Sequence, residues 1–384
     1  MREAARRKVL VAATAIAAGL AMLGSGCGDD AEDSALDSGE RMLVGFADSS
    51  AAYPYPGSPS AERLARLEAA GGGEVGRLTI RWETVEPQPP EAGEDPSYDW
   101  DAVSPVIEAL ASEGIAPLPV LLGAPRWARD RSPACRRSDA ICPPAEARID
   151  EFARFSAAAA EQFADQGLAG IEIWNEPNLA AFWESAEGPD PARYAALFAA
   201  AHRALREQDP ELRVLIGGLA YPREGGDGGD IELEPFLDAF YGSLDSGVLD
   251  DSTVLSFHPY PAVGVNGLDA LQGAIDEALA VTARHDPDRE LWATEVGLST
   301  TDPRGPSPPS EEQQAETIVA ALGHLEGVDA VKVALVYTVV DRPRSQAAIG
   351  QAGYGIVGRG PAFEPKLAYC AIVEAREMPR PRGC

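Results

Sequence analysis

The chain has 384 residues, of which 45% are hydrophobic, and this is enough to build a large buried core. Its formal net charge is −29, and no basic patch offsets the repulsion that phosphates would meet. The composition therefore argues against nucleic-acid binding, and the acidity itself is interpreted only as a feature of solubility.

The N-terminus has the pattern of an export signal. A basic stretch precedes an apolar run from Val9 to about Leu23, and small residues then lead to Cys27. This order is typical of a secretory signal peptide and is too short for a membrane span. The end of the run resembles a bacterial lipobox, shifted by one place, which implies that Cys27 is lipidated. An ordinary signal peptide cleaved nearby is the alternative, and the Arg6-Arg7 pair is a weak twin-arginine signal.

The organisation that follows has three parts after the signal peptide of residues 1–27. Residues 28–41 are small and acidic, cannot bury a core and are interpreted as a flexible tether. Residues 42–378 are expected to form one catalytic domain, and residues 379–384 a C-terminal tail. We expect an extracytoplasmic protein, either secreted or held at the membrane only through its N-terminal lipid anchor.

The remaining cysteines are expected to form disulfides, because export permits them. Cys135 and Cys142 flank a polar, proline-bounded loop, and Cys370 and Cys384 are placed to join the tail to the last helix. Neither spacing resembles a zinc site, and the four histidines form no His-x-His or His-Glu-x-x-His motif. The sequence therefore predicts no metal and no cofactor.

From residue 42 onward, short apolar runs alternate with longer amphipathic ones. The apolar runs predict strands at 42–46, 77–82, 116–122, 170–174, 213–216, 253–257, 291–294 and 331–337. The amphipathic runs predict helices at 60–70, 100–113, 145–166, 191–208, 234–243, 268–285, 310–326 and 365–377. Nearly continuous hydrophobic strands are typical of a parallel sheet that helices cover.

This alternation predicts a (β/α)8 TIM barrel with a single catalytic domain, because no second block of strands is present. A doubly wound open sheet is the alternative, but no Gly-x-Gly-x-x-Gly follows the first strand. In a barrel, the long loops that follow the strands all lie at the C-terminal face, where active sites are built. These loops span residues 83–98, 123–144, 217–231 and 339–364.

Two of the predicted strands end on a glutamate. The run Ile-Glu-Ile-Trp-Asn-Glu-Pro-Asn stops at Pro177, so Glu176 lies where the chain leaves the sheet. The run Leu-Trp-Ala-Thr-Glu likewise ends on Glu295. If these are strands four and seven, the carboxylates face each other across the mouth of one barrel. Such a pair suits cleavage of a glycosidic bond, which needs one group to protonate the leaving oxygen and another to attack the sugar carbon.

Several motifs along the chain belong to one known pattern. They are Arg81-Trp82, Glu86-Pro87, Tyr98-Asp99-Trp100, Ala124-Pro125-Arg126-Trp127, Trp174-Asn175-Glu176-Pro177-Asn178, His258-Pro259-Tyr260, Thr294-Glu295 and Pro365-Lys366-Leu367-Ala368-Tyr369. With them the sequence resembles the clan A glycoside hydrolases, retaining barrel enzymes with catalytic glutamates on strands four and seven. It is most similar to families 5 and 39, over roughly residues 42–377.

The resemblance implies a role for each matching residue around the bond that is cleaved. Glu176 would be the general acid/base, and Glu295 would be the nucleophile. Asn175 would bind the 2-hydroxyl of the sugar. Arg81 would lie beside Glu295 and keep it ionised, since a nearby cation favours a charged carboxylate. In the plainer interpretation, Glu176 is a turn carboxylate that caps a helix, Glu295 is a salt-bridge partner at a strand end, and Arg81 is structural only.

Four further residues are candidates for binding the substrate. His258 would line the sugar site, and Tyr260 would hydrogen-bond the nucleophile. Trp127 would stack on a sugar ring, although packing at the rim is an equal alternative. Tyr337 would stand where the clan often has a tryptophan at the end of strand eight.

The sequence as a whole therefore predicts an exported, retaining glycoside hydrolase that cleaves β-glycosidic bonds of a poly- or oligosaccharide. The carboxyl groups are expected ~5 Å apart, as in retaining enzymes. A carbohydrate substrate and a monomeric state are expected. A non-catalytic glycan-binding protein on the same barrel and a transglycosylase are the alternatives, because fold alone does not guarantee an activity.

Overall fold

The structure is a computed structural model that describes residues 41–137, 141–221, 229–262, 267–302, 307–345 and 351–384. The expected signal peptide, the lipidation site Cys27 and nearly all of the tether lie outside the described residues. No helix among the described residues is long and apolar enough to cross a membrane.

Eight parallel strands form a closed barrel in sequence order, and β8 pairs back onto β1. The strands are β1 Leu43–Ala47, β2 Val75–Arg81, β3 Ala116–Leu122, β4 Ile171–Asn175, β5 Val214–Ala220, β6 Thr253–His258, β7 Leu291–Val296 and β8 Val331–Val336. The predicted (β/α)8 barrel is confirmed, and the doubly wound open sheet is excluded because the sheet has no edge.

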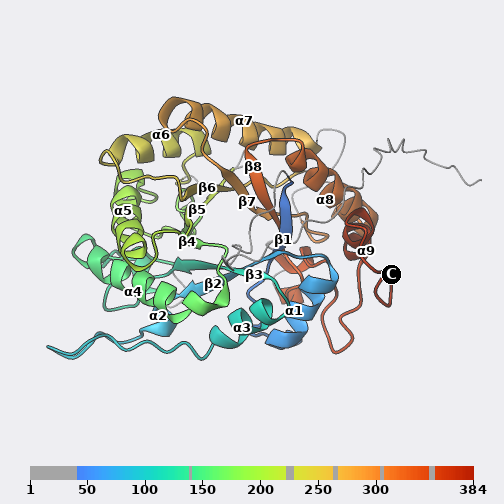
Figure 1. The fold of residues 1–384 in the computed structure, drawn as a ribbon, viewed down its shortest axis with the longest axis horizontal. Coiled ribbons are helices and arrows are strands. Elements are labelled where there is room, and N and C mark those ends of the chain that lie inside the picture. Colours follow the sequence, from blue (N-terminus) through green and yellow to red (C-terminus); the bar gives the residue numbers. More distant parts are fainter. Residues whose placement is uncertain (1–40, 138–140, 222–228, 263–266, 303–306, 346–350) are drawn as a thin grey trace, which may run out of the picture. The chain divides into compact units, whose positions relative to one another are not determined.

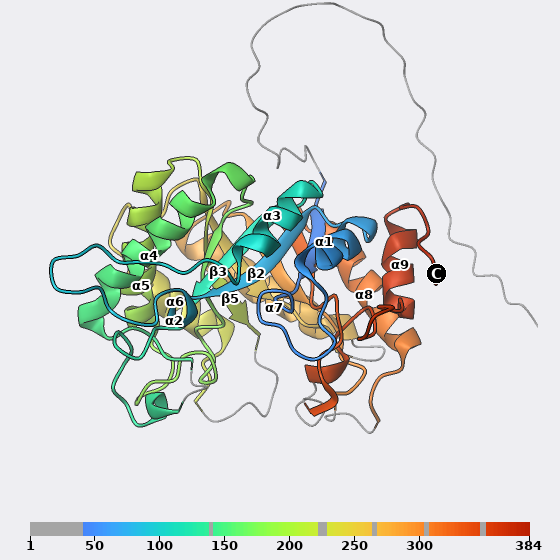
Figure 2. The ribbon, with the colours of Figure 1, turned by 90° about the horizontal axis from the view of Figure 1, so that it is seen from below.

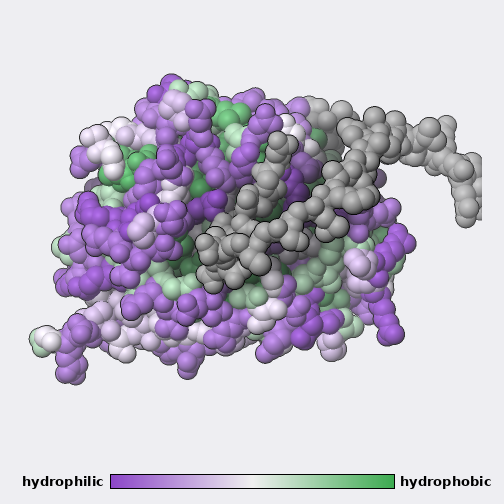
Figure 3. Space-filling view, in the orientation of Figure 1, coloured by the Kyte–Doolittle hydropathy of each residue, from purple (hydrophilic) through white to green (hydrophobic). Residues whose placement is uncertain are grey.

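Helices surround these strands (Figures 1 and 2). The helices are α1 Ala61–Ala70, α2 Trp82–Val85, α3 Ser104–Ser112, α4 Ile149–Gln162, α5 Pro191–Gln208, α6 Leu233–Ser243, α7 Gly267–His285, α8 Glu311–Glu326 and α9 Leu367–Ala375. Short 3₁₀ turns are η1 Ala134–Arg136, η2 Glu146–Arg148, η3 Ala164–Gln166 and η5 Gln351–Gly353. The face seen in Figure 3 is mostly hydrophilic, in keeping with the net charge of −29.

Two helix starts illustrate how local sequence sets the element boundaries. Ser60 accepts a hydrogen bond from the backbone N–H of Arg63 and so begins α1. Ser310 and Gln313 form a reciprocal capping box at the start of α8. Such caps satisfy N–H groups that have no partner inside the helix, and each contributes about 1 kcal/mol.

The strand predicted at 213–216 is longer than expected and ends at Ala220. The pair Gly217-Gly218 breaks the apolar pattern, which is why the sequence alone ends the strand early. The structure explains the glycine at position 218 by close packing. A Cβ there would lie 2.2 Å from His258 Nε2 and 2.7 Å from a carboxylate oxygen of Glu172.

The hydrophobic core has two layers, which follow the alternation of side chains along each strand. Leu118, Leu215 and Leu335 belong to the layer inside the barrel. Ile80 and Ile173 belong to the larger layer between the strands and the helices. Polar side chains replace the inner layer towards the C-terminal ends of the strands, where the pocket described below opens.

Both predicted disulfides are present. Cys135 and Cys142 are bonded with their Cα atoms 5.9 Å apart, and Cys370 and Cys384 with their Cα atoms 5.3 Å apart. The second bridge ties the end of the chain to α9, and the C-terminus lies beside this helix in Figures 1 and 2.

Candidate active site

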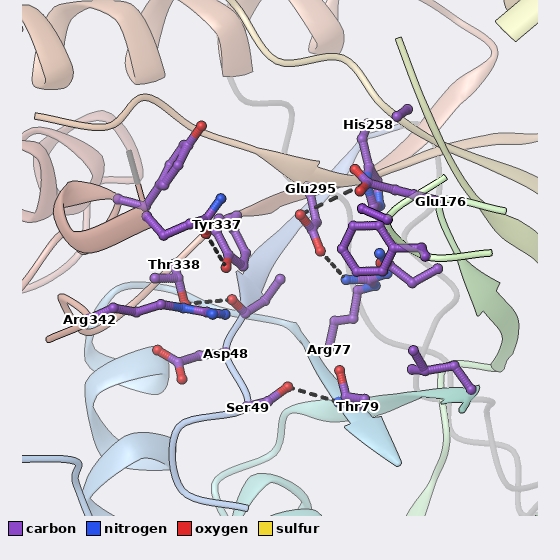
Figure 4. Close-up of a pocket in the computed structure, with 18 of the residues that line it drawn as sticks. Asp48, Ser49, Arg77, Thr79, Glu176, His258, Glu295, Tyr337, Thr338 and Arg342 are labelled. Atoms are coloured by element: carbon purple, nitrogen blue, oxygen red, sulfur yellow. Dashed lines mark hydrogen bonds and ion pairs between the residues drawn. The ribbon is translucent and has the colours of Figure 1, made fainter. Parts of the chain in front are cut away.

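A pocket of about 820 Å³ opens at the C-terminal ends of the strands. Its lining includes Glu176 just after β4, His258 at the end of β6 and Glu295 in β7 (Figure 4). The two glutamates therefore meet as the sequence predicts, at the mouth of one barrel. One carboxylate oxygen of each glutamate and one ring nitrogen of His258 lie within 4.8 Å of one another. Retaining glycosidases hold their two carboxyl groups ~5–5.5 Å apart, whereas inverting enzymes need ~6.5–9.5 Å.

The backbone around Glu176 leaves the sheet abruptly. Trp174 and Glu176 have φ angles of 75° and 44°, in the left-handed region that residues other than glycine rarely adopt. Each such residue costs on the order of 1 kcal/mol, and such conformations gather at functional sites. The turn brings the Glu176 carboxylate 2.8 Å from Nδ1 of His258.

Glu295 is held by two donors in the buried part of the pocket. Arg77 Nη1 lies 2.5 Å from one carboxylate oxygen, and the Tyr260 hydroxyl lies 2.5 Å from the other. The expected contact between Tyr260 and Glu295 is thus seen. The expected contact between Arg81 and Glu295 is wrong, because Arg77 occupies that position.

Strand geometry explains the correction. Arg77 and Arg81 are four residues apart on β2, so their side chains point to the same face of the strand. Arg77 lies deeper in the barrel and is 5% exposed. Arg81 is the last residue of the strand, and its side chain is 39% exposed. It lines the pocket, lies over the ring of Tyr53 and pairs with Glu83 at 3.3 Å.

Arg77 also binds two residues of β4. Its Nε donates to Glu172 at 2.6 Å and its Nη2 to the Asn175 side-chain oxygen at 2.8 Å. Sequence reasoning missed Arg77 and Glu172. A signal for Glu172 was available, since it is a charged residue between two isoleucines of a buried strand.

The fully buried Glu172 is stabilised by donors from several strands. Besides Arg77, it accepts hydrogen bonds from the Gly218 N–H at 2.5 Å, the Ser256 hydroxyl at 2.8 Å and the Thr294 hydroxyl at 3.2 Å. A buried carboxylate needs such partners, because an unpaired charge in a dry interior costs several kcal/mol.

The two facing glutamates have different acidities. Burial raises the pKa of Glu176 above its ordinary value, and the hydrogen bond from His258 only partly offsets this. Burial also opposes ionisation of Glu295, but the charges of His258 and Arg77 and the hydrogen bond from Tyr260 outweigh it and lower its pKa. The two pKa values are thus shifted in opposite directions, so Glu176 holds its proton more tightly and Glu295 ionises more readily.

His258 is buried and Tyr260 is half-buried, and both respond to the same charges. Burial lowers the pKa of His258, but Glu295 and Glu176 outweigh it and raise the pKa. Burial and the charge of Glu295 raise the pKa of Tyr260, so its hydroxyl stays protonated and donates.

The two remaining aromatic candidates lie in different surroundings. Tyr337 lines the pocket and packs edge-on against Tyr260, with ring centroids 6.3 Å apart. Trp127 is not among the residues that line the pocket. Its Nε1 donates to the Glu86 carbonyl, and its ring packs edge-on against Trp82. Packing at the rim is thus the interpretation that the structure favours for Trp127.

Glu176, His258 and Glu295 are also close enough for a metal ion to bind between them. The donor set argues against this use. Both oxygens of Glu295 already accept hydrogen bonds, from Arg77 and from Tyr260. The guanidinium would repel a second cation at this distance.

Comparison with known proteins identifies relatives by structure alone. No protein-family model and no curated sequence matches the chain. A family 39 glycoside hydrolase from Bacteroides cellulosilyticus is similar with a TM-score of 0.59 and 20% identity, over 88% of this chain and 64% of that one. A monomeric β-xylosidase from Caulobacter crescentus has a TM-score of 0.61 and 21% identity, over 87% of this chain and 67% of that one. An exo-β-1,4-mannosidase from an Opitutaceae bacterium has a TM-score of 0.58 and 20% identity, over 89% of this chain and 62% of that one.

The chain thus spans less than two thirds of the length of the Bacteroides enzyme. At these identities the likeness establishes a shared barrel fold. The neighbours agree with the clan A resemblance read from the sequence, and family 39 is named among them.

Proposed function

We propose that the protein is a retaining glycoside hydrolase that cleaves β-glycosidic bonds of a poly- or oligosaccharide by double displacement. The observation that carries the proposal is the pairing of Glu176 and Glu295, with oxygens within 4.8 Å and with acidities shifted in opposite directions. The structural likeness to β-glycosidases supports it.

In the first step, Glu176 gives its proton to the glycosidic oxygen. At the same time an ionised oxygen of Glu295 attacks the anomeric carbon, and the bond from that carbon to the leaving oxygen breaks. The products of this step are the released alcohol and a sugar bound as an ester to Glu295.

In the second step, Glu176 is a carboxylate and acts as a base. It takes a proton from a water molecule, whose oxygen attacks the same anomeric carbon. The ester bond breaks, and Glu295 leaves as a carboxylate. Two inversions at one carbon retain its configuration, and Glu176 is protonated again for the next cycle.

The surrounding residues support these two roles. Arg77 and Tyr260 hold the Glu295 carboxylate and favour its charged form before the attack. The Asn175 oxygen is bound by Arg77, which leaves its side-chain N–H groups to donate to a sugar hydroxyl. Arg81, His258 and Tyr337 line the pocket and are proposed to contact the substrate.

We also propose that the protein acts outside the cytoplasmic membrane, anchored through a lipidated Cys27. The two disulfides support an oxidising compartment. Mass analysis of the mature N-terminus tests the anchor. A chain that begins at lipidated Cys27 supports it, and an unmodified start elsewhere overturns it.

The activity is tested on aryl β-glycosides and polysaccharides with the wild type, Glu176→Ala and Glu295→Ala. Glu74→Ala is the control, because Glu74 pairs with Arg41 and Arg376 away from the pocket. We expect each pocket variant to lose at least about a hundredfold in rate, while the control keeps the wild-type rate.

Proton NMR of the first product and azide rescue test the course of the reaction. The newly formed anomer should be β, and azide should restore turnover to Glu176→Ala with a retained β-azide. Hydrolysis that survives both substitutions unchanged would show that the site is wrong. An inverted product would overturn double displacement, and glycan binding without turnover would favour a binding protein.

A further inference from the structure

Arg342 lies on the segment that follows β8 and lines the same pocket as the two glutamates (Figure 4). Its guanidinium carbon is 5.4 Å from the centre of the Tyr337 ring. Stacking on an aromatic face restrains the position of a guanidinium while leaving its N–H groups free to donate in their own plane. Arg342 is therefore a positioned cation in the pocket.

The other pocket arginines already form ion pairs, whereas Arg342 makes no ion pair or hydrogen bond in the part of the chain that the structure describes. Arg77 is paired with Glu172 and Glu295, and Arg81 with Glu83. The acid drawn nearest to Arg342 in Figure 4 is Asp48. Both oxygens of Asp48 accept backbone hydrogen bonds, from Ser50 at 2.6 Å and from Val340 at 2.9 Å.

The position of Arg342 points to one part of the substrate. Tyr337, on which Arg342 stacks, packs against Tyr260, and Tyr260 donates to Glu295. Arg342 therefore belongs to the wall of the pocket that carries the nucleophile. The sugar that reaches this wall is the one whose anomeric carbon Glu295 attacks.

We propose that this sugar carries a carboxylate, as a uronosyl residue does, and that Arg342 binds the carboxylate. The inference rests on the proposed function and specifies the substrate class of the same site. A guanidinium offers two parallel N–H groups that match the two oxygens of a planar carboxylate. Because Arg342 makes no ion pair with a described residue, its N–H groups remain available to a carboxylate, whereas a neutral sugar offers no charge to pair with the guanidinium.

The test compares aryl β-glycosides in pairs that share ring stereochemistry and differ only at C6. Each pair consists of a uronide and its neutral glycoside, and a 6-O-sulfated glycoside is the third arm. The variants are Arg342→Gln, Arg342→Lys and Arg344→Gln, in the full chain. Arg344 is the matched control because it lies two residues further on and is exposed. Thermal unfolding confirms that each variant is folded.

We expect the wild type to prefer the uronide in at least one pair, as the ratio of kcat/KM values. Arg342→Gln should lower this ratio by about tenfold to a hundredfold, the range of a lost charge-assisted hydrogen bond. Arg342→Lys should restore part of it, and Arg344→Gln should leave it unchanged. A ratio that survives Arg342→Gln, or neutral glycosides preferred in every pair, overturns the inference. Preference for the sulfated arm would overturn the carboxylate assignment.

Calorimetric titration with free D-glucuronate and D-galacturonate, against glucose and galactose, separates this inference from the activity. If the wild type binds uronate, Arg342→Gln abolishes this binding and no glycoside is hydrolysed, the inference holds and the proposed function fails. Hydrolysis of neutral glycosides by a chain that binds no uronate sustains the function while the inference fails.

Discussion

Arg77 and Glu172 form a buried ion pair in which Arg77 Nε lies 2.6 Å from a Glu172 oxygen. This contact uses one edge of the guanidinium and aims the other two nitrogens at Glu295 and Asn175. A single cation thus contacts Glu295 on β7, Asn175 on β4 and Glu172, a carboxylate that does not line the pocket. Glu172 acts on the chemistry only through Arg77, and so it is a positioning residue.

Replacing Glu172 by Gln should lower both stability and activity. The amide cannot accept from all four donors, and breaking a buried pair costs about 3–5 kcal/mol of unfolding free energy. Loss of the Glu172 charge also leaves Arg77 to act on Glu295 alone, so the pKa of Glu295 should fall. The low-pH limb of kcat/KM should therefore move to lower pH. Urea unfolding and pH–rate profiles check both effects.

The control is Glu74→Gln, which removes a carboxylate from ion pairs with Arg41 and Arg376. It should leave the pH–rate profile unchanged. If the Glu172→Gln protein is destabilised but its low-pH limb of kcat/KM matches the wild type, the role of Glu172 is purely structural.

Replacing Tyr260 by Phe should shift the same limb in the opposite direction. Activity should fall below the pKa of Glu295 and above that of Glu176, because Glu295 must be ionised and Glu176 protonated. The Tyr260 hydroxyl favours the charged form of Glu295, so its loss raises the Glu295 pKa and moves the low-pH limb upward. We expect kcat/KM to fall about tenfold at the optimum. Tyr221→Phe, at another tyrosine of the pocket lining, is the control.

Glu68 should make stability depend on pH. It lies on the buried face of α1, is 1% exposed, and one of its carboxylate oxygens has no hydrogen-bond partner among the described residues. Burial, with the nearby charge of Asp48, raises its pKa well above the ordinary value. The folded chain then keeps a proton that the unfolded chain loses, so wild-type stability falls with pH above about 4.5, by about 1.4 kcal/mol per unit.

The neutral variant Glu68→Gln removes this titration. Relative to the wild type it should become more stable as the pH rises from about 5 until Glu68 ionises in the folded chain, which thermal unfolding at several pH values measures. Glu62→Gln, on the exposed side of the same helix, is the control. A constant difference between Glu68→Gln and the wild type across this range would show that Glu68 is ionised in the folded protein.

The bridge between Cys370 and Cys384 should stabilise the fold without touching the site. It closes a loop with a sequence separation of 14 residues, for which chain entropy predicts about 3 kcal/mol. The double variant Cys370→Ala/Cys384→Ala should lose roughly this free energy of unfolding in denaturant. Its pH–rate profile at a temperature where it is folded should match the wild type. A shifted profile would show that the C-terminal bridge also shapes the pocket.

The sequence was sufficient for the barrel and for the two glutamates because both depend on local patterns. Hydrophobic periodicity marks strands and helices, and a carboxylate before Pro177 or after Thr294 marks a strand end. The depth at which a side chain lies inside the barrel does not follow from a local pattern, since it depends on strand tilt and on residues from other strands. Arg77 and Arg81 share one face of β2, and nothing in the linear pattern says which of them reaches Glu295.

The same limit applies to Glu172 and Trp127. Glu172 is tolerable in the core only because four strands bring donors to it, and those partners are far away in the sequence. Trp127 has the residue type of a sugar platform, but its ring is used against Trp82. Whether an aromatic residue binds or packs is decided by its tertiary neighbours.

The pairing between the first and last strands has a consequence for folding during synthesis of the chain. β1 pairs with β8, and the Thr338 hydroxyl donates to the Ala47 carbonyl across 291 positions of the sequence. A nascent chain that stops before Val331 leaves both β1 and β7 with open edges, each a template for pairing with another molecule. Barrel closure, and the catalytic geometry that needs it, therefore waits until nearly the whole polypeptide has emerged, a topology that favours slow folding and dependence on chaperones.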